Sequence, residues 1–186
     1  MRPGSSTLAL FYLVALWSFV EATLFFIAPD ALLSIIALRS LGKAMMAALV
    51  ASFAAAFGGL IVWTCAQHFP EETLQVLLLV PGISGSTFEM AGQLLQAGLF
   101  EGLLGGAFSG IPYKVLSAEA GYASVPAQTL FLVSPAARLP RFVLVAFISW
   151  SLSRLVGARL SDKRKLALCL AVWPFVYANY FLNAGW

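Results

Sequence analysis

The stretch of sequence that decides the fold is Ser109-Gly110-Ile111-Pro112-Tyr113-Lys114-Val115-Leu116-Ser117-Ala118-Glu119-Ala120-Gly121. It contains a lysine, a glutamate, a proline and two glycines, although the chain around it is strongly apolar. Glycine and proline interrupt a helix, and interrupted backbone at membrane depth is tolerated only against protein or a wet cavity. Charged side chains at that depth mark a functional site by default. The sequence therefore predicts that the chain is organised around this stretch and a partner near Glu21 and Asp30.

The composition predicts a membrane protein. Of 186 residues, 61% are hydrophobic and only 10% are charged, and the mean hydropathy is +0.90. An ordinary soluble domain carries roughly 25% charged residues, so a soluble fold of this composition would expose too much apolar surface. The net charge of +3 is mild, and the basic residues are not interleaved with aromatic ones. We therefore expect membrane lipids as partners and no nucleic acid.

The sequence contains no pattern typical of a metal site or an enzyme. Cys65, Cys169 and the single His68 do not have the spacing of a metal site. The segment Gly82-Ile83-Ser84-Gly85-Ser86 fails the G-x-S-x-G pattern of a hydrolase, because a serine stands at position 86. We expect no catalytic residues, no metal and no cofactor.

The expected fold is an all-α integral membrane protein, a single polytopic domain with two opposed re-entrant helical hairpins. The apolar segment after Pro29 has only about eight residues, whereas a crossing needs about 20. A segment that enters the membrane, breaks near Pro29 and returns to the same side is a simpler arrangement than a full crossing followed by a half crossing. The expected elements are a first re-entrant hairpin over residues 8–38, a transmembrane helix over 44–66, a helix over 86–99, a second re-entrant hairpin over 102–125, a kinked transmembrane helix over 126–156, a basic loop over 154–165 and a last span over 166–186.

Local signals place the ends of these elements. The hairpins are expected to break at Pro29, Gly110, Pro112 and Gly121. A capping box at residues 86–89 predicts a helix that begins there, and residues 67–72 read as a polar loop. Prolines 126, 135 and 140 predict a kinked or broken helix in the region that follows. The small residues of 44–66, among them Gly58 and Gly59, predict close approach by a neighbouring helix.

The strongest basic loop sets the expected orientation. Residues 154–165 contain Arg154, Arg159, Lys163, Arg164 and Lys165 against one acid, Asp162. Such loops are usually cytoplasmic, and Arg2, Arg39 and Lys43 agree if the first hairpin returns to its own side. Trp186 is then an aromatic anchor at the far interface. We expect a multi-pass protein of a bacterial inner membrane.

A weak internal repeat relates the two hairpins. Each has a proline followed, four and five residues later, by Leu-Ser, which gives Pro29 with Ser34 and Pro112 with Ser117. Each match coincides with charged residues in apolar surroundings. Inverted hairpins that meet near the midplane are a common way for transporters to build a substrate site.

The energetic cost of the charges supports a sheltered site. A charged group at the bilayer centre costs roughly 2.5–3.5 kcal/mol on insertion scales. Glu21, Asp30, Lys114, Glu119 and Arg138 therefore need partners or a wet cavity. The alternative is that these residues, and Arg141, lie at the membrane interface as markers of helix ends.

Several of these segments resemble the DedA/VTT family (SNARE-associated Golgi proteins), and most closely its smaller YqaA-like branch. The similar segments are Phe19-Val20-Glu21, Pro29-Asp30-Ala31-Leu32-Leu33, the run from Phe108 to Lys114, Ala120-Gly121 and Phe131. Asp30 stands where the family usually has Glu, Ser109 or Gly110 replaces a first arginine, and Lys114 replaces a second arginine one residue early. The resemblance covers about residues 15 to 155.

The resemblance implies opposed re-entrant hairpins and movement of lipids or lipid-linked phosphates across the bilayer. In this interpretation Lys114, with Tyr113, Arg138 or Arg141, binds an anionic headgroup. Glu21, Asp30 and Glu119 pair with these cations at rest and exchange protons during turnover. Two other hypotheses stay open: a proton- or cation-coupled transporter of a small solute, and a non-transporting membrane scaffold. A homo-oligomer is compatible with all three.

Overall fold

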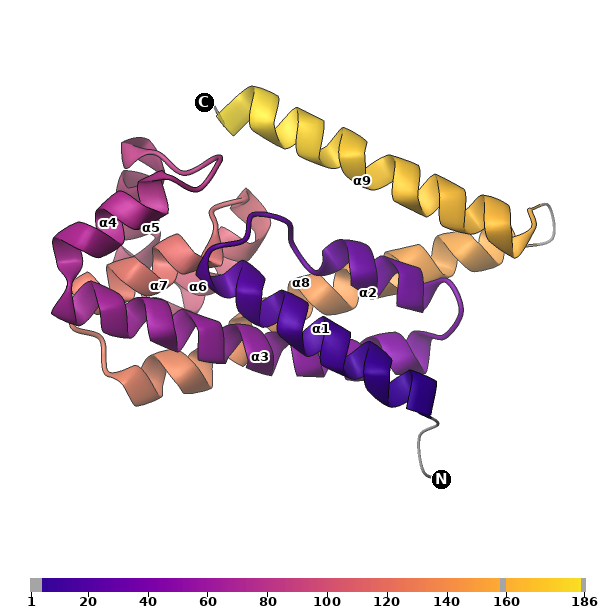
Figure 1. Cartoon of the computed structure of the whole chain (residues 1–186), viewed down its shortest axis with the longest axis horizontal. Helices are drawn as coiled ribbons and strands as arrows, with labels where there is room; N and C mark the ends of the chain where they lie inside the picture. Colours follow the sequence, from indigo (N-terminus) through magenta and orange to yellow (C-terminus); the bar gives the residue numbers. More distant parts are fainter. Residues whose placement is uncertain (1–4, 158–159, 185–186) are drawn as a thin grey trace.

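The protein is built from helices over the part of the chain that the structure describes, and no strand occurs there (Figure 1). The structure is a computed structural model that describes residues 5–157 and 160–184. Arg2, Arg159 and Trp186, which served above as interface markers, lie outside these residues. The helices are α1 (Ser5–Thr23), α2 (Asp30–Ala37), α3 (Leu41–His68), α4 (Pro70–Leu78), α5 (Gly85–Gln96), α6 (Leu99–Ser109), α7 (Tyr113–Tyr122), α8 (Ala127–Leu155) and α9 (Asp162–Ala184).

Two of the described helices, α3 and α8, are long and apolar enough to cross a membrane by length and composition. At 1.5 Å per residue, each is about 40 Å long, against a hydrocarbon core of about 30 Å. Shorter apolar helices cover Thr7–Thr23 and Leu99–Ser109. The expected last span, residues 166–186, falls mostly within α9, which is not one of these two helices.

Helix α3 is the centre of the fold, and it packs against α1, α7 and α8. Its buried face consists of small residues, so that the neighbouring backbones come close. A Cβ atom built on Gly58 would lie 2.7 Å from the carbonyl oxygen of Phe19 in α1. A Cβ atom on Gly121 of α7 would lie 2.8 Å from the carbonyl oxygen of Trp63 in α3. The close approach predicted from the small residues of 44–66 therefore occurs on two sides of α3.

Two helix–loop–helix hairpins, α1–α2 and α6–α7, pack against α3 and α8. The first loop spans residues 24–29, and Pro29 is the N-cap of α2. The second begins at Gly110, whose φ of 86° is in the left-handed region that glycine adopts without a steric penalty, and Pro112 is the N-cap of α7. Ser34 and Ser117 each donate to the carbonyl four residues earlier, at 2.8 and 3.0 Å. The serine contact is thus common to the two hairpins, whereas the two prolines differ in backbone conformation, with ψ of −6° at Pro29 and 133° at Pro112.

The structure corrects several boundaries. The first break falls at residues 24–29 rather than at Pro29 alone, and Gly121 lies inside α7. The capping box is formed by Ser84 and Thr87, two residues before the expected one, so α5 begins at Gly85. The expected loop 67–72 is divided between α3 and α4. Helix α8 runs unbroken through Pro135 and Pro140, although proline weakens a helix interior.

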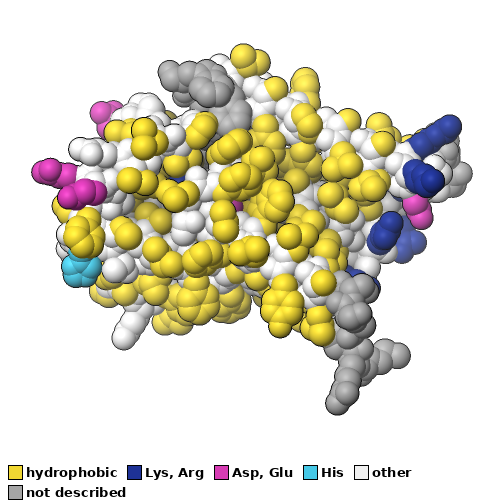
Figure 2. Space-filling view, in the orientation of Figure 1, with side chains coloured by type: hydrophobic (Ala, Val, Ile, Leu, Met, Phe, Trp, Pro, Cys, Tyr) yellow, Lys and Arg dark blue, Asp and Glu magenta, His cyan; other side chains and the backbone are white. Residues whose placement is uncertain are grey.

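The surface divides into an apolar middle and two polar ends (Figure 2). In this view Lys and Arg gather at the end where α8 runs into α9, and Asp, Glu and His gather at the opposite end. Large hydrophobic side chains are exposed between them, including Leu16, Phe53, Phe57, Phe147 and Phe175. A contiguous apolar surface of this kind is typical of proteins that contact lipid.

Candidate functional site: a charged cluster between two hairpins

The loops of the two hairpins meet at Lys114, in the first turn of α7. Its ammonium donates a hydrogen bond of 2.8 Å to the carbonyl oxygen of Phe25, in the loop of the other hairpin. The residue is only 1% exposed, and it is the largest fully buried side chain in the described chain. A backbone carbonyl has no full charge, so this lysine is buried without a bonded carboxylate among the described residues. The site therefore contains a cation that is not neutralised by a direct partner.

Arg138 of α8 forms a buried ion pair with Glu21 of α1. The Nη2 atom lies 2.9 Å from Oε2, and the two side chains are 9% and 10% exposed. The guanidinium also lies over the ring of Tyr113, 4.3 Å from its centroid, and 5.2 Å from the centroid of Phe142. These rings supply a cation–π contact and exclude water from the pair.

A second pair joins Arg141, one turn further along α8, to Asp30 at the start of α2. The Asp30 side chain is fully buried, whereas that of Arg141 is 32% exposed. The other terminal nitrogen of Arg141 donates to the carbonyl oxygen of Ala107 in α6, at 2.9 Å. One guanidinium thus connects both hairpins to α8.

Tyr113 completes the wall of the cluster. Its hydroxyl donates a hydrogen bond of 2.7 Å to Ser134 of α8, which in turn donates to the carbonyl oxygen of Leu130. The ring lies where a Cβ atom would stand if Gly59 of α3 carried one. A glycine at this position is therefore what allows the tyrosine to reach the cluster.

Most of these side chains, but not Lys114, line a cavity of about 140 Å³. Its charged lining consists of Glu21, Asp30, Arg138 and Arg141, and one side is closed by Trp173 and Tyr177 of α9. Within the described chain, Oδ1 of Asp30 and Nε of Arg138 are buried and have no hydrogen-bond partner. Buried polar atoms are nearly always satisfied by protein or by a bound molecule. Both residues also line the cavity, so its wall contains one unsatisfied acceptor and one unsatisfied donor.

The formal charges of the cluster do not cancel. The four charged side chains that line the cavity balance one another, and Lys114, which contacts Phe25 and does not line the cavity, adds one positive charge to the cluster. An excess buried cation is costly unless an anion joins it. The arrangement is therefore suited to a group with a single negative charge, such as a phosphodiester.

Six of the seven charged or aromatic residues predicted for the site lie in this cluster, and Glu119 does not. Glu119 is half-buried near the far end of α7, beside Gly92, and it pairs with no cation in the described part of the chain. Of the predicted break residues, Gly110 and Pro112 line the cavity. Gly121 lies at the contact with α3 instead.

Three contributors to the site could not be predicted from the sequence. Tyr177 of α9 accepts a hydrogen bond of 2.8 Å from the backbone N–H of Ala28, in the first hairpin loop. Ser134 binds Tyr113, and Phe25 contributes only a backbone oxygen. Every residue has a backbone carbonyl, so the residue type does not show which carbonyl accepts a hydrogen bond. For Tyr177 the only available signal was its spacing of four from Trp173, whose ring lies 6.0 Å away.

No model of a known family, no curated protein and no solved structure matches this chain. The resemblance to the DedA/VTT family therefore stays a prediction that rests on the short segments quoted above. The functional argument that follows depends on the geometry of the cluster.

Proposed function

We propose that this protein crosses a membrane several times and moves an anionic lipid, or a lipid-linked phosphate, from one leaflet to the other. The observation that carries the proposal is the buried cluster between two interrupted hairpins, with its excess positive charge and its unsatisfied donor and acceptor. Discontinuous helices that meet in the protein interior form the substrate sites of many transporters. The apolar middle of the surface supports a bilayer as the surrounding solvent (Figure 2).

In this mechanism the phosphate competes with the two carboxylates for the arginines. Arg138 and Arg141 exchange Glu21 and Asp30 for phosphate oxygens, which a guanidinium binds through two parallel hydrogen bonds. Lys114 supplies the remaining charge. When the headgroup leaves, the carboxylates return, so the cations are never buried alone. The proposal takes the two interrupted hairpins to be the opposed re-entrant hairpins that the DedA/VTT resemblance implies.

The size of the cavity decides which part of the lipid enters it. About 140 Å³ is well below the roughly 300–1,000 Å³ of pockets that enclose a drug-sized molecule. Only the phosphate group fits, and the acyl chains stay in the bilayer. The wall formed by Trp173 and Tyr177 of α9 must therefore open sideways during transport.

The proposal predicts a loss of lipid movement in Lys114→Ala. Vesicles that contain the purified protein and a fluorescent phosphatidylglycerol are treated with a membrane-impermeant quencher, which reports the rate of exchange between leaflets. We expect the variant to be at least about tenfold slower than the wild type, because the uncompensated cation is gone. Lys163→Ala, which removes an exposed lysine, is the matched control. If Lys114→Ala and Glu21→Gln both move lipid at the wild-type rate, the proposal is wrong.

A second candidate function is coupled transport of a proton or a small cationic solute. It is favoured by Oδ1 of Asp30, a buried carboxylate oxygen without a hydrogen-bond partner on a residue that lines the cavity. The same vesicles distinguish the two functions. Uptake of protons or solute that depends on Asp30, with no exchange of the fluorescent lipid, would favour the second function.

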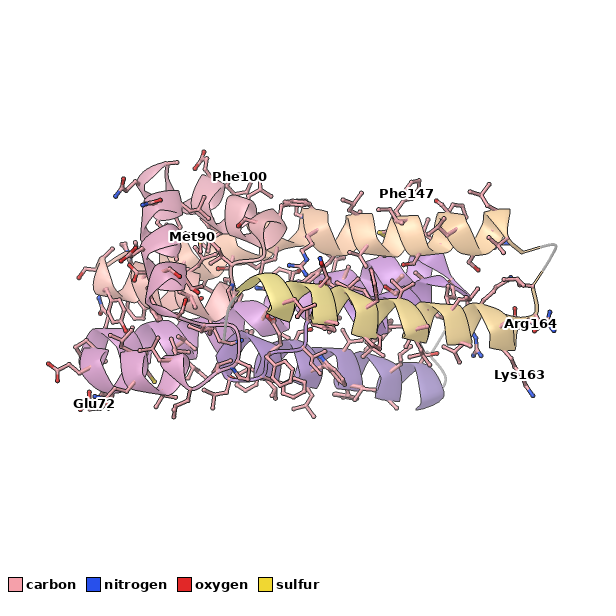
Figure 3. The ribbon with its side chains drawn as sticks, turned by 90° about the horizontal axis from the view of Figure 1, so that it is seen from above. Glu72, Met90, Phe100, Phe147, Lys163 and Arg164 are labelled. Carbon is pink, nitrogen blue, oxygen red and sulfur yellow. The ribbon has the colours of Figure 1, made fainter. Side chains whose placement is uncertain are left out.

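The membrane orientation is a separate prediction. Figure 3 shows Glu72 at one end of the molecule and Lys163 and Arg164 at the other. Since basic ends face the cytoplasm, a cysteine at position 163 should react with an impermeant reagent only in inside-out vesicles. A cysteine at position 72 should react only from the opposite side, in a background from which Cys65 and Cys169 have been removed. Labelling of both positions from the same side would contradict a spanning arrangement.

A further inference from the structure

A second cavity lies at the basic end of the molecule, away from the charged cluster. It has a volume of about 300 Å³ and lies between the start of α1, the turn from α2 to α3, and the start of α9. Arg39, Lys43 and Lys165 line it together with one acid, Asp162. Among the residues that the structure describes, Arg39 and Lys43 form no ion pair. This cavity therefore has two more positive charges than negative ones.

The contact of Lys165 with the one acid is weak. Its Nζ atom lies 3.8 Å from Oδ1 of Asp162, which is too long for a hydrogen bond. The Asp162 side chain is 85% exposed, whereas that of Lys165 is only 16% exposed. The lysine is thus turned into the molecule, although a charged side chain at a surface normally points into water.

The basic residues also lie at the wrong ends of their helices for helix stability. Lys43 is in the first turn of α3, and Lys165 is in the first turn of α9. The N-terminus of a helix has a partial positive charge, so cations there are unfavourable and anions are favourable. The stability of the helices therefore does not explain these lysines, whereas an anion between them would be attracted by the side chains and by both helix ends.

An apolar groove continues from this cavity along the molecule. It has a volume of about 490 Å³ and runs between α8 and α9, lined by residues such as Val145, Ile148, Leu168 and Val172. Leu38 and Lys165 line both the basic cavity and the groove. At its other end, Trp173 lines both the groove and the charged cavity. A positively charged mouth thus leads into an apolar channel that ends beside the cluster.

We propose that this cavity and groove form a binding site for one anionic phospholipid, with its phosphate at Arg39, Lys43 and Lys165 and an acyl chain between α8 and α9. The shape matches the two halves of such a lipid, because a charged pocket opens directly into an apolar groove. Basic pockets between helices on the cytoplasmic side are suited to anionic headgroups. The inference needs the chain to lie in a membrane, but it does not depend on lipid transport by the cluster.

Native mass spectrometry of the full chain, purified in detergent, tests the site. Phosphatidylglycerol and phosphatidylcholine with the same acyl chains are added, and the bound lipid is counted. We expect phosphatidylglycerol to bind at least about tenfold more tightly, because several cations attract its net charge. We expect Arg39→Gln/Lys43→Gln to weaken that binding by about tenfold.

The matched control removes the same charge from the same end of the molecule. Lys163 and Arg164 point away from the body and do not line the cavity (Figure 3). Lys163→Gln/Arg164→Gln should leave the affinity within about twofold of the wild type. If the two double variants weaken lipid binding equally, the lipid is attracted to the basic surface in general, and the proposed site is wrong.

Two further arms test the groove and the source of the phosphate. Ser149→Trp fills the groove, so it should weaken the binding of phosphatidylglycerol as much as Arg39→Gln/Lys43→Gln does. Inorganic phosphate in excess should not displace the bound lipid; full displacement would show a phosphate site and overturn the lipid assignment. Lys114→Ala should lose at most the lipid bound at the cluster and keep the lipid that Arg39→Gln/Lys43→Gln loses, so a failure of this site and a failure of the transport proposal give different results.

Discussion

The variant Glu21→Ala is expected to lose about 3–5 kcal/mol of unfolding free energy, the range observed when one partner of a buried ion pair is removed. The reason is that Arg138 stays buried between Tyr113 and Phe142 without its carboxylate. Its Nε atom already has no hydrogen-bond partner, so little in the surroundings can compensate. Unfolding in detergent, followed by tryptophan fluorescence, measures the change.

A paired replacement separates the structural role of this ion pair from its role in transport. In Glu21→Leu/Arg138→Met both charges are removed and the volume is kept, so most of the lost stability should return. The same protein should still fail in the vesicle assay, because the phosphate has lost a guanidinium. Asp162→Ala is the control, since the Asp162 side chain is 85% exposed and its contact with Lys165 is long, at 3.8 Å. Wild-type unfolding of Glu21→Ala would mean that this pair does not form in the folded protein.

The existence of a sheltered charged cluster could be predicted, because the physical reason is visible in the sequence. Charges inside apolar segments cannot face lipid, so Glu21, Lys114 and Arg138 had to find partners or a cavity. Proline and glycine next to them indicated where the helices end. This argument uses only residue types and local order, and the structure brings these residues together at one site.

The partners themselves could not be predicted from the sequence. Arg138 and Glu21 are 117 residues apart, and Arg141 and Asp30 are 111 residues apart. Which arginine meets which acid depends on the rotation of α8 about its axis, and packing of the whole molecule sets that rotation. Glu119 illustrates the limit, since it is on the same short helix as Lys114 but lies outside the cluster.

The contribution of α9 to the site also could not be predicted from the sequence. Residues 166–186 were expected to form a span, but nothing indicated that Trp173 and Tyr177 close the cavity. An aromatic residue in an apolar helix faces lipid or protein with equal ease, so its type does not reveal its neighbours. The same ambiguity applies to Pro135 and Pro140, which looked like breaks and lie inside one helix.

Gly59→Ala in α3 is expected to destabilise the protein, because the added Cβ atom would meet the ring of Tyr113. The new Cβ atom would lie 2.6 Å from Cζ of Tyr113, so the ring must move. Overpacking of this kind costs about 1–3 kcal/mol, and loss of the hydrogen bond from Tyr113 to Ser134 adds about 1 kcal/mol. Gly42→Ala in the same helix is the control, because no atom lies within 4 Å of its added Cβ. That variant should be neutral or more stable by about 0.5–1 kcal/mol.

A double-mutant cycle shows whether the damage acts through the tyrosine ring. Tyr113→Ala alone removes a buried ring and should cost about 3–5 kcal/mol, by analogy with other aromatic side chains in cores. In Gly59→Ala/Tyr113→Ala the added methyl group no longer meets the ring. The double variant should therefore be more stable than the sum of the two single losses predicts, by about 1 kcal/mol or more. Simple additivity would mean that Gly59 is needed for something other than space for Tyr113, and the wall of the cluster would then need another explanation.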